Sequence, residues 1–248
     1  MKKLVLISFL ITGITLLFTG CLNTEGNYQI LPPVPAVVNY NSLKGGNTLL
    51  TCWSEIAAPG LSTHSSGDCI IVQFKLDYDN QPASNYYTAT EVTVIEDVEH
   101  SLARIEDEIS VGDFTFPIED MAVIDYNYIT FLDGKYFLRF KHEGMKNQLI
   151  EYRMLTSPND KNEENGTHNV YLVAKKKNEI EDGTTTTLIN SHAFDMKNLI
   201  LNLGRDTVKD NINSKYLKVD LKFFTGKEED EPVFKDYNST SIELIVHK

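Results

Sequence analysis

The sequence predicts a mainly β protein, with an N-terminal OB-like small barrel followed by a C-terminal antiparallel β-sandwich. The composition favours strands, because 12 Tyr and 12 Phe accompany many Val, Ile and Thr residues. Short apolar segments with alternating polarity recur along the chain, and turn residues separate them. No regular alternation of strands and helices occurs, which disfavours a parallel α/β fold. The apolar fraction of 42% is sufficient for real hydrophobic cores.

The first module is predicted over residues 35–112. Its strongest strand follows Gly67-Asp68, where Val72, Phe74 and Leu76 alternate with polar residues and should share one face. Val92 and Val94 should likewise share a face of a later strand. The other strands are expected at 35–41, 47–53 and 86–95, with a turn at Lys44-Gly45-Gly46.

A short amphipathic helix is expected at 96–109. Val98, Leu102, Ile105 and Ile109 recur there at helical spacing among charged residues. Four or five short strands with one helix fit a small barrel such as an OB-fold.

The second module is predicted over residues 113–248. Asp133-Gly134 between two alternating runs is a strong hairpin signal. Residues Tyr136, Leu138 and Phe140 should fall on one face of the second hairpin strand, with Phe137 and Arg139 on the other. Further strands are expected at 148–155, 169–175, 185–190, 215–224 and 241–247. Many short strands without crossover helices indicate a sandwich.

The N-terminus has the form of an export signal. Lys2 and Lys3 precede an apolar run at 4–18 that is too short for a stable membrane span. Residues 1–20 are therefore predicted to be a signal peptide. The small residues before Cys21 resemble a lipobox, so Cys21 is predicted to be lipidated and residues 21–34 to form a lipidated tether. The alternative is an ordinary cleaved signal peptide with an incidental cysteine.

This signal determines the expected location and partners. The chain should be anchored to the outer membrane through its lipid, in the cell envelope and facing the periplasm, with surface exposure as the alternative. Loss of Lys2 and Lys3 would change the net charge from −12 to −14 (−12 minus 2). So acidic a chain is repelled by phosphates, which excludes nucleic acid as an expected partner. An envelope protein or a glycan is expected instead.

Two cysteines remain after Cys21, namely Cys52 and Cys69. They lie near candidate strands, and an exported protein meets an oxidising compartment, so a disulfide between them is predicted. Two buried thiols acting as small hydrophobic side chains are the alternative. No CxxC motif or nearby histidine supports a metal pair.

The chain resembles the NigD-like lipoproteins of Bacteroides and Prevotella. The resemblance rests on the lipobox, on Gly67-Asp68 leading into the strand at 70–76, on the run at 136–142, and on Phe194-Asp195-Met196 before the late strand at 216–224. It implies an OB-type domain followed by a β-sandwich. The family takes its name from a bacteriocin operon, so the resemblance also implies an immunity or self-protection role as an alternative function. It implies no mechanism.

No catalytic signature is present. The sequence lacks HExxH, GxSxG, P-loop and GxGxxG motifs, so we expect a non-enzyme with no cofactor and no metal. An envelope hydrolase with catalytic residues from distant positions is the less favoured alternative. The acidic loop Asp77 to Gln81 lacks the glycine and glutamate of an EF-hand, which leaves only a looser calcium site open. The histidines, all isolated and expected at the surface or in loops, are His64, His100, His142, His168, His192 and His247.

Aromatic residues of the first module are the main binding candidates. Trp53, Tyr86 and Tyr87 adjoin polar loops and could stack on a sugar or peptide, although the favoured alternative is that Trp53 and one of the tyrosines fill the barrel core. Asp206-Thr207-Val208 looks like an O-glycosylation acceptor of Bacteroides proteins, so Thr207 is a predicted modification site. The expected function is that of a non-catalytic cell-envelope lipoprotein whose β domains bind a ligand or protein.

Overall fold

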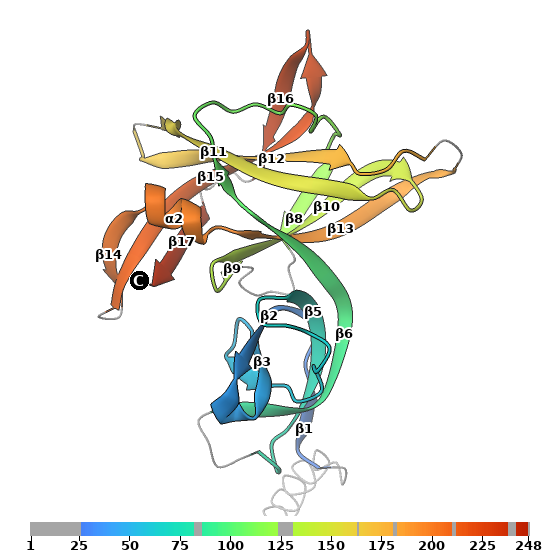
Figure 1. The fold of residues 1–248 in the computed structure, drawn as a ribbon, viewed down its shortest axis with the longest axis vertical. Helices are drawn as coiled ribbons and strands as arrows, with labels where there is room; N and C mark the ends of the chain where they lie inside the picture. Colours follow the sequence, from blue (N-terminus) through green and yellow to red (C-terminus); the bar gives the residue numbers. More distant parts are fainter. Residues whose placement is uncertain are drawn as a thin grey trace, which may run out of the picture.

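The computed structural model describes residues 26–81, 86–123, 131–162, 164–180, 183–209, 212–237 and 242–247. Two β modules are stacked end to end, with a barrel below and a sandwich above in Figure 1. The long strand β6 (Tyr87–Leu102) runs from the first module into the second. The predicted signal peptide and Cys21 lie outside the described residues.

The N-terminal module is a closed barrel of five strands. The ring runs β2-β3-β4-β6-β5 and closes back onto β2. Among its described residues the one parallel pairing is between β4 and β6, and this strand order is that of an OB-fold, so the predicted OB-like barrel is confirmed. The strands besides β6 are β2 (Val34–Asn41), β3 (Gly46–Leu50), β4 (Glu55–Ala57) and β5 (Cys69–Asp77), with the short 3-10 helix η1 (Ser42–Lys44) between β2 and β3.

The barrel interior is lined by the apolar faces that the alternation of apolar and polar residues in the strands predicts. Phe74 and Leu76 are almost fully buried in one cluster, against which Val92 and Val94 pack. An exposed strand, β1 (Tyr28–Ile30), pairs with the end of β5. The predicted tether at 21–34 therefore overlaps β1, and β2 begins at its last residue, Val34. Its proline-punctuated sequence allowed no strand to be recognised there.

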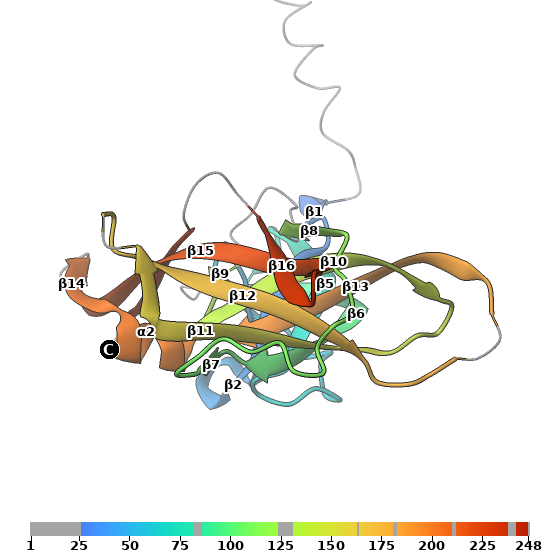
Figure 2. The same cartoon turned by 90° about the horizontal axis from the view of Figure 1, so that it is seen from above.

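The C-terminal module is a sandwich of two sheets. One contains β8 (Asp120–Val123), β9 (Phe131–Leu132), β10 (Lys135–Met145), β13 (Thr185–Asp195) and the end of β6. The second sheet contains β7 (Arg104–Ile105), β11 (Ile150–Asn162), β12 (Thr167–Lys176), β14 (Arg205–Lys209), β15 (Ile212–Glu228), β16 (Glu231–Asp236) and β17 (Ile242–His247). Its strands β11, β12 and β15 lie side by side in Figure 2. Pairing is mostly antiparallel, but β6–β13, β7–β11 and β12–β15 are parallel.

Both sheets contribute to one large apolar core. Tyr136, Leu138 and Phe140 of β10 pack with residues of β11, β12 and β15, while Phe137 points to the opposite face. This confirms the predicted faces of β10. The helix α2 (Lys197–Leu203) adds buried Leu199 and Ile200. The predicted hairpin is also present, and Asp133 and Gly134 both have the positive φ of its two-residue turn, 46° and 78°.

The predicted helix at 96–109 is wrong, because half of this segment continues the strand β6 and residues 104–105 form β7. Val94 pairs with Val72 but Glu96 pairs with Ile71, so Ile95 is bulged out of register and is 53% exposed. This bulge interrupts the alternation of a strand. The apolar residues beyond it then fall at helical spacing although no helix forms, and Val98 is buried whereas Leu102 is 62% exposed.

The two modules share an apolar interface. Val37, Cys69 and Val98 of the barrel pack with Phe137 and Ala193 of the sandwich. Pairing of β6 with β5 ends at Val98, and pairing with β13 begins at Glu99. The change of module therefore lies within β6, before the boundary predicted after residue 112, because one continuous strand serves both.

Candidate ligand pocket between the modules

A cavity of about 180 Å³ lies where β6 separates from β13. The two strands are paired in parallel from His192 and Glu99 onward, and before this point β6 turns away into the barrel. Separation of two strands leaves an opening at the edge of β13. We call this cavity the fork pocket; its lining residues are Glu96, Asp97, Glu99, Gln148, Leu149, Ile150, Tyr152, Lys177, Asn190, Ser191 and His192.

The β13 side of the fork pocket carries polar atoms without partners. In the part of the chain that the structure describes, Asn190 Nδ2, Ser191 Oγ and His192 Nδ1 are buried and make no hydrogen bond. Arg139, which lies opposite Ser191 on β10, also has a buried unpaired atom, Nε. The Asn190 side chain lies close enough to the Tyr152 hydroxyl to oppose the rise in the pKa of that tyrosine, but Nδ2 does not reach full hydrogen-bonding geometry. Buried polar atoms are normally paired, so such a group indicates a place for a polar ligand.

The β6 side of the fork pocket carries three carboxylates, each with a positive or imidazole partner. Glu99 Oε2 lies 2.9 Å from Lys177 Nζ, and Asp97 Oδ1 lies 2.9 Å from His64 Nε2. Glu96 is 4.0 Å from Arg139 Nη2. The rim is therefore polar and largely charge-compensated.

His192 is held neutral in the wall of the pocket. It is 4% exposed and contacts the rings of Tyr152 and Phe194 at centroid distances of 5.5 and 4.7 Å. Burial lowers its pKa to about 4, although the charge of Glu99 opposes this shift. Its Nε2 is hydrogen-bonded to Ser101 Oγ at 2.9 Å.

Ser101 and His192 lie as close together as a catalytic nucleophile and its base, but His192 is too weakly basic for this role. A histidine with a pKa near 4 is a weak base at neutral pH. The Nδ1 atom, which a carboxylate orients in a hydrolytic triad, is unpaired. The arrangement is thus better suited to holding a ligand than to activating a serine.

A buried network fixes the aromatic wall. The Tyr152 ring stacks on Phe140 at 4.2 Å, and its hydroxyl donates to His142 Nε2 at 2.9 Å. The Nδ1 of His142 in turn donates to the carbonyl of Pro117 at 2.7 Å. Burial raises the pKa of Tyr152 and lowers that of His142, so both stay neutral. This network holds the Tyr152 wall of the pocket in one orientation.

The expectation that the histidines lie at the surface or in loops is wrong for three of them. His142, His168 and His192 are buried within strands β10, β12 and β13. Alternation could have shown this, since His142 continues the buried face of Leu138 and Phe140, and His192 is two residues from buried Phe194. The unpaired atoms of Asn190 and Ser191 have no comparable sequence signal.

The predicted aromatic residues do not form one platform. Trp53 is 37% exposed and lies edge-on against barrel residue Phe74, at 5.9 Å. The ring of Tyr86 lies under Lys44 Nζ at 4.9 Å. Tyr87 is exposed and contacts Tyr78. Each ring has a different neighbour, and the Trp53–Phe74 contact belongs to the packing of the barrel.

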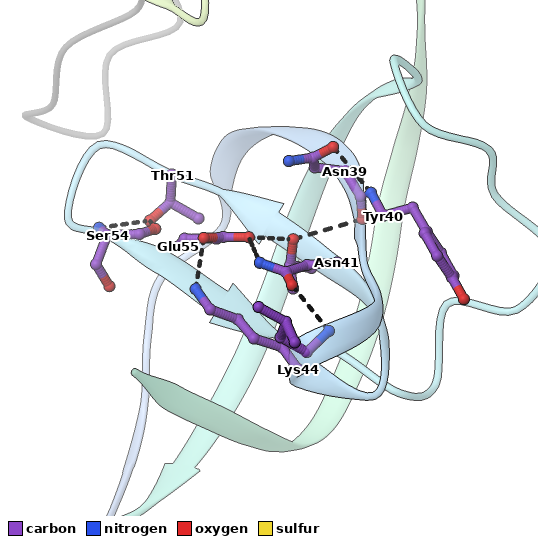
Figure 3. A network of polar contacts seen from close by, with 9 residues as sticks. Asn39, Tyr40, Asn41, Lys44, Thr51, Ser54 and Glu55 are labelled. Atoms are coloured by element: carbon purple, nitrogen blue, oxygen red, sulfur yellow. Dashed lines mark hydrogen bonds and ion pairs between the residues drawn. The ribbon is translucent and has the colours of Figure 1, made fainter. Parts of the chain in front are cut away.

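A polar network beside these rings ties the β2–β3 loop to β4 (Figure 3). Glu55 accepts hydrogen bonds from Lys44, Asn41 and Thr48. The Lys44 bond lowers the pKa of this carboxyl, with Thr48 and Asn41 adding to the effect. These bonds all lie within the barrel, so the network serves the loop conformation.

Cys52 and Cys69 are free thiols in the structure, in place of the predicted disulfide. Both belong to the apolar interface between barrel and sandwich. Their burial there matches the alternative role of small hydrophobic side chains. Burial raises the pKa of Cys69 to about 12.

The remaining predicted sites are dispersed. Thr207 is half-buried on the edge strand β14, opposite Ser214. In the loop after β5, the Asp77 carboxylate accepts from Asp79 N and Asn80 Nδ2, which stabilises the turn itself. Within the described residues no three His, Cys, Asp or Glu side chains are arranged to hold a metal ion. Nor does any helix in that part of the chain have the length and apolarity of a membrane span.

Several solved structures are similar to this chain. An uncharacterised protein of Parabacteroides merdae is similar with a TM-score of 0.62 and 13% identity, over 86% of this chain and 98% of that chain. A candidate lipoprotein of Bacteroides fragilis has a TM-score of 0.48 and 13% identity, over 89% and 97% of the two chains. A NigD-like immunity protein of Bacteroides caccae has a TM-score of 0.45 and 9% identity, over 85% and 92%. No protein-family model and no curated protein matches the sequence. At such identities the likeness concerns the fold alone.

Proposed function

We propose that this protein is a non-catalytic cell-envelope lipoprotein that binds a small polar ligand in the fork pocket. The main evidence for the ligand site is the group of unpaired buried atoms at Asn190, Ser191 and His192. The N-terminal sequence supports the anchor, since an export signal ends directly before Cys21. The outer membrane is the proposed site of attachment, with the soluble part in the periplasm.

The position of the pocket favours binding. Ligand sites occur preferentially where domains meet, because concave surfaces form there. The apolar interface around Phe137 and Val98 holds the two modules together, and the Tyr152 network fixes one wall. A pocket formed in advance loses little conformational entropy when a ligand enters.

The low basicity of His192 supports a non-catalytic role. A hydrolase would need a base that accepts the Ser101 proton near neutral pH. With a pKa near 4 and no carboxylate at Nδ1, His192 provides neither the basicity nor the orientation.

A variant that obstructs the mouth of the pocket tests this function. Leu149 is 59% exposed at the rim, so Leu149→Trp should fill the opening without disturbing the core. Leu201→Trp is the matched control, on a 45% exposed leucine of α2 outside the pocket. The chain from residue 21, with Cys21→Ser to prevent lipidation, is incubated with small molecules extracted from bacterial envelopes. Retained compounds are then identified by mass spectrometry.

We expect the parent chain and Leu201→Trp to retain the same compound and Leu149→Trp to lose it. Equal retention by all three chains, or by none, would contradict the proposed function. The anchor is tested separately, because a ligand site at the fork does not depend on it.

A further inference from the structure

The chemistry of the fork pocket identifies its ligand class more narrowly. We propose that it holds the terminal residue of a neutral glycan, a single pyranose ring bound through its hydroxyl groups. This inference rests on the proposed function, since it concerns the same pocket.

The unpaired atoms of the pocket wall would be satisfied by hydroxyl groups of a ligand. Asn190 Nδ2 is a donor and needs an acceptor. Ser191 Oγ can donate or accept. His192 Nδ1 does either, according to the tautomer that its Nε2 bond to Ser101 imposes. A hydroxyl both donates and accepts, so it satisfies every one of these atoms, whereas an ammonium or a carboxylate satisfies only part of them.

The charges around the pocket favour a neutral ligand. An anion gains little, because Lys177, the lysine of the pocket lining, is already bound to Glu99. A cation gains little, because the carboxylates of Glu96, Asp97 and Glu99 are already engaged by positive or imidazole partners. Carboxylates with a free lone pair still accept hydrogen bonds from neutral hydroxyls.

Size and shape agree with one sugar residue. The cavity, of about 180 Å³, is smaller than the roughly 300 to 1,000 Å³ of sites for drug-sized ligands, yet it holds more than a single water. Leu149 and Ile150 add apolar surface that suits the C–H groups of a pyranose. The 59% exposure of Leu149 marks an open side through which a longer chain could continue.

Binding of defined probes tests the ligand class. The probes are the methyl glycosides of glucose, galactose and mannose, with glucuronate as the anionic match, glucosamine as the cationic match, and N-acetyl-alanine amide as a neutral peptide. Saturation-transfer NMR and calorimetry are applied to the chain from residue 21 with Cys21→Ser. Asn190→Ala removes one donor from the pocket, and Asn213→Ala is the matched control on an exposed strand position of β15.

We expect at least one methyl glycoside to bind, at least tenfold more weakly to Asn190→Ala and equally to Asn213→Ala. Unchanged unfolding midpoints of both variants would attribute the loss to the site. If only the charged sugars or the peptide bind, in an Asn190-dependent manner, the neutral-glycan assignment is overturned while the proposed function stands. Binding of no probe, together with no retained envelope compound, overturns both.

Discussion

His192 combines deep burial with a nitrogen that has no partner, and its pKa makes it a sensitive probe of the fork pocket. The folded-state pKa is about 4, against about 6.5 in an unfolded chain. The unfolded chain therefore binds more protons between these values, so stability is complete above pH 6.5 and is lost as the pH falls toward 4.

The pH dependence of unfolding tests this state of His192. Between pH 7 and pH 5 the free energy of unfolding should fall by about 2 kcal/mol more in the parent chain than in His192→Gln, which cannot be protonated there. Urea unfolding at the two pH values measures the difference. Equal losses in the two chains would show that His192 is accessible to protons in the folded state.

The two interface thiols should differ in reactivity. Cys69 is buried with a pKa of about 12, so roughly one thiol in 10,000 is ionised at pH 8. Burial also raises the pKa of Cys52, but this residue is half-buried. Alkylation with iodoacetamide at pH 8, in the chain carrying Cys21→Ser, should therefore modify Cys52 well before Cys69.

Peptide mass spectrometry reads out this reaction, and alkylation in urea is the control, in which both thiols should react alike. If neither thiol reacts in urea until a reductant is added, Cys52 and Cys69 form a disulfide. This result would contradict the assignment of both as free thiols.

The sequence predicts which residues of a strand share a buried face, but it does not predict every buried polar residue. Alternation placed Tyr136, Leu138 and Phe140 on the buried face of β10 correctly, and the same rule would have buried His142. Treating each histidine as an isolated polar residue hid this. The surroundings of Asn190 and Ser191 depend on strands far apart in sequence, so no local pattern reports that these side chains are buried without partners.

Among the secondary-structure elements, β6 is the one whose sequence pattern predicted a helix where the structure has a strand. The bulge at Ile95 shifts the register of the strand, and the apolar residues beyond it imitate a helix. The strand is held instead by pairing with β5 and then with β13, which are long-range contacts. Hairpin signals such as Asp133-Gly134 were reliable because two adjacent residues determine that turn.

Strand β10 offers a test of the connection between the modules. Phe137 is fully buried in the interface between barrel and sandwich. Phe137→Ala should cost about 3 to 5 kcal/mol, because a cavity remains where the ring was. Since the interface joins both modules, hydrogen exchange should accelerate in β5 of the barrel as well as in β10.

Phe234→Ala on β16 is the control, because Phe234 is half-buried and lies outside the interface. It should leave exchange in β5 unchanged. Unaltered exchange of β5 in Phe137→Ala would mean that the modules are stable independently of each other.

For the whole molecule, composition and alternation were enough to predict a barrel followed by a sandwich. They could not predict how the two are joined, because a strand shared between two sheets looks like any other strand until its partners are known. The pocket arises from that shared strand, which is why the sequence directed attention to Trp53 and Tyr86 in the barrel.

The anchor is also a property of the whole chain. Cys21→Ser should prevent acylation, so the protein should leave the membrane fraction on ultracentrifugation of lysed cells. Lys2→Arg, which keeps the positive charge before the apolar run, is the control and should remain in the membrane fraction. Persistence of the Cys21→Ser chain in washed membranes would contradict lipid anchoring.

The side-chain amide of Asn190 provides the most direct test that the fork pocket is the ligand site. Its nitrogen resonance is followed while envelope extract is added to the isotopically labelled chain, with the exposed Asn213 of β15, outside the pocket, as the internal reference. We predict a saturable shift at Asn190 in the parent chain that is absent when Leu149→Trp blocks the mouth. An Asn190 resonance that does not move, or that moves equally in the blocked chain, would contradict the assignment of the fork pocket.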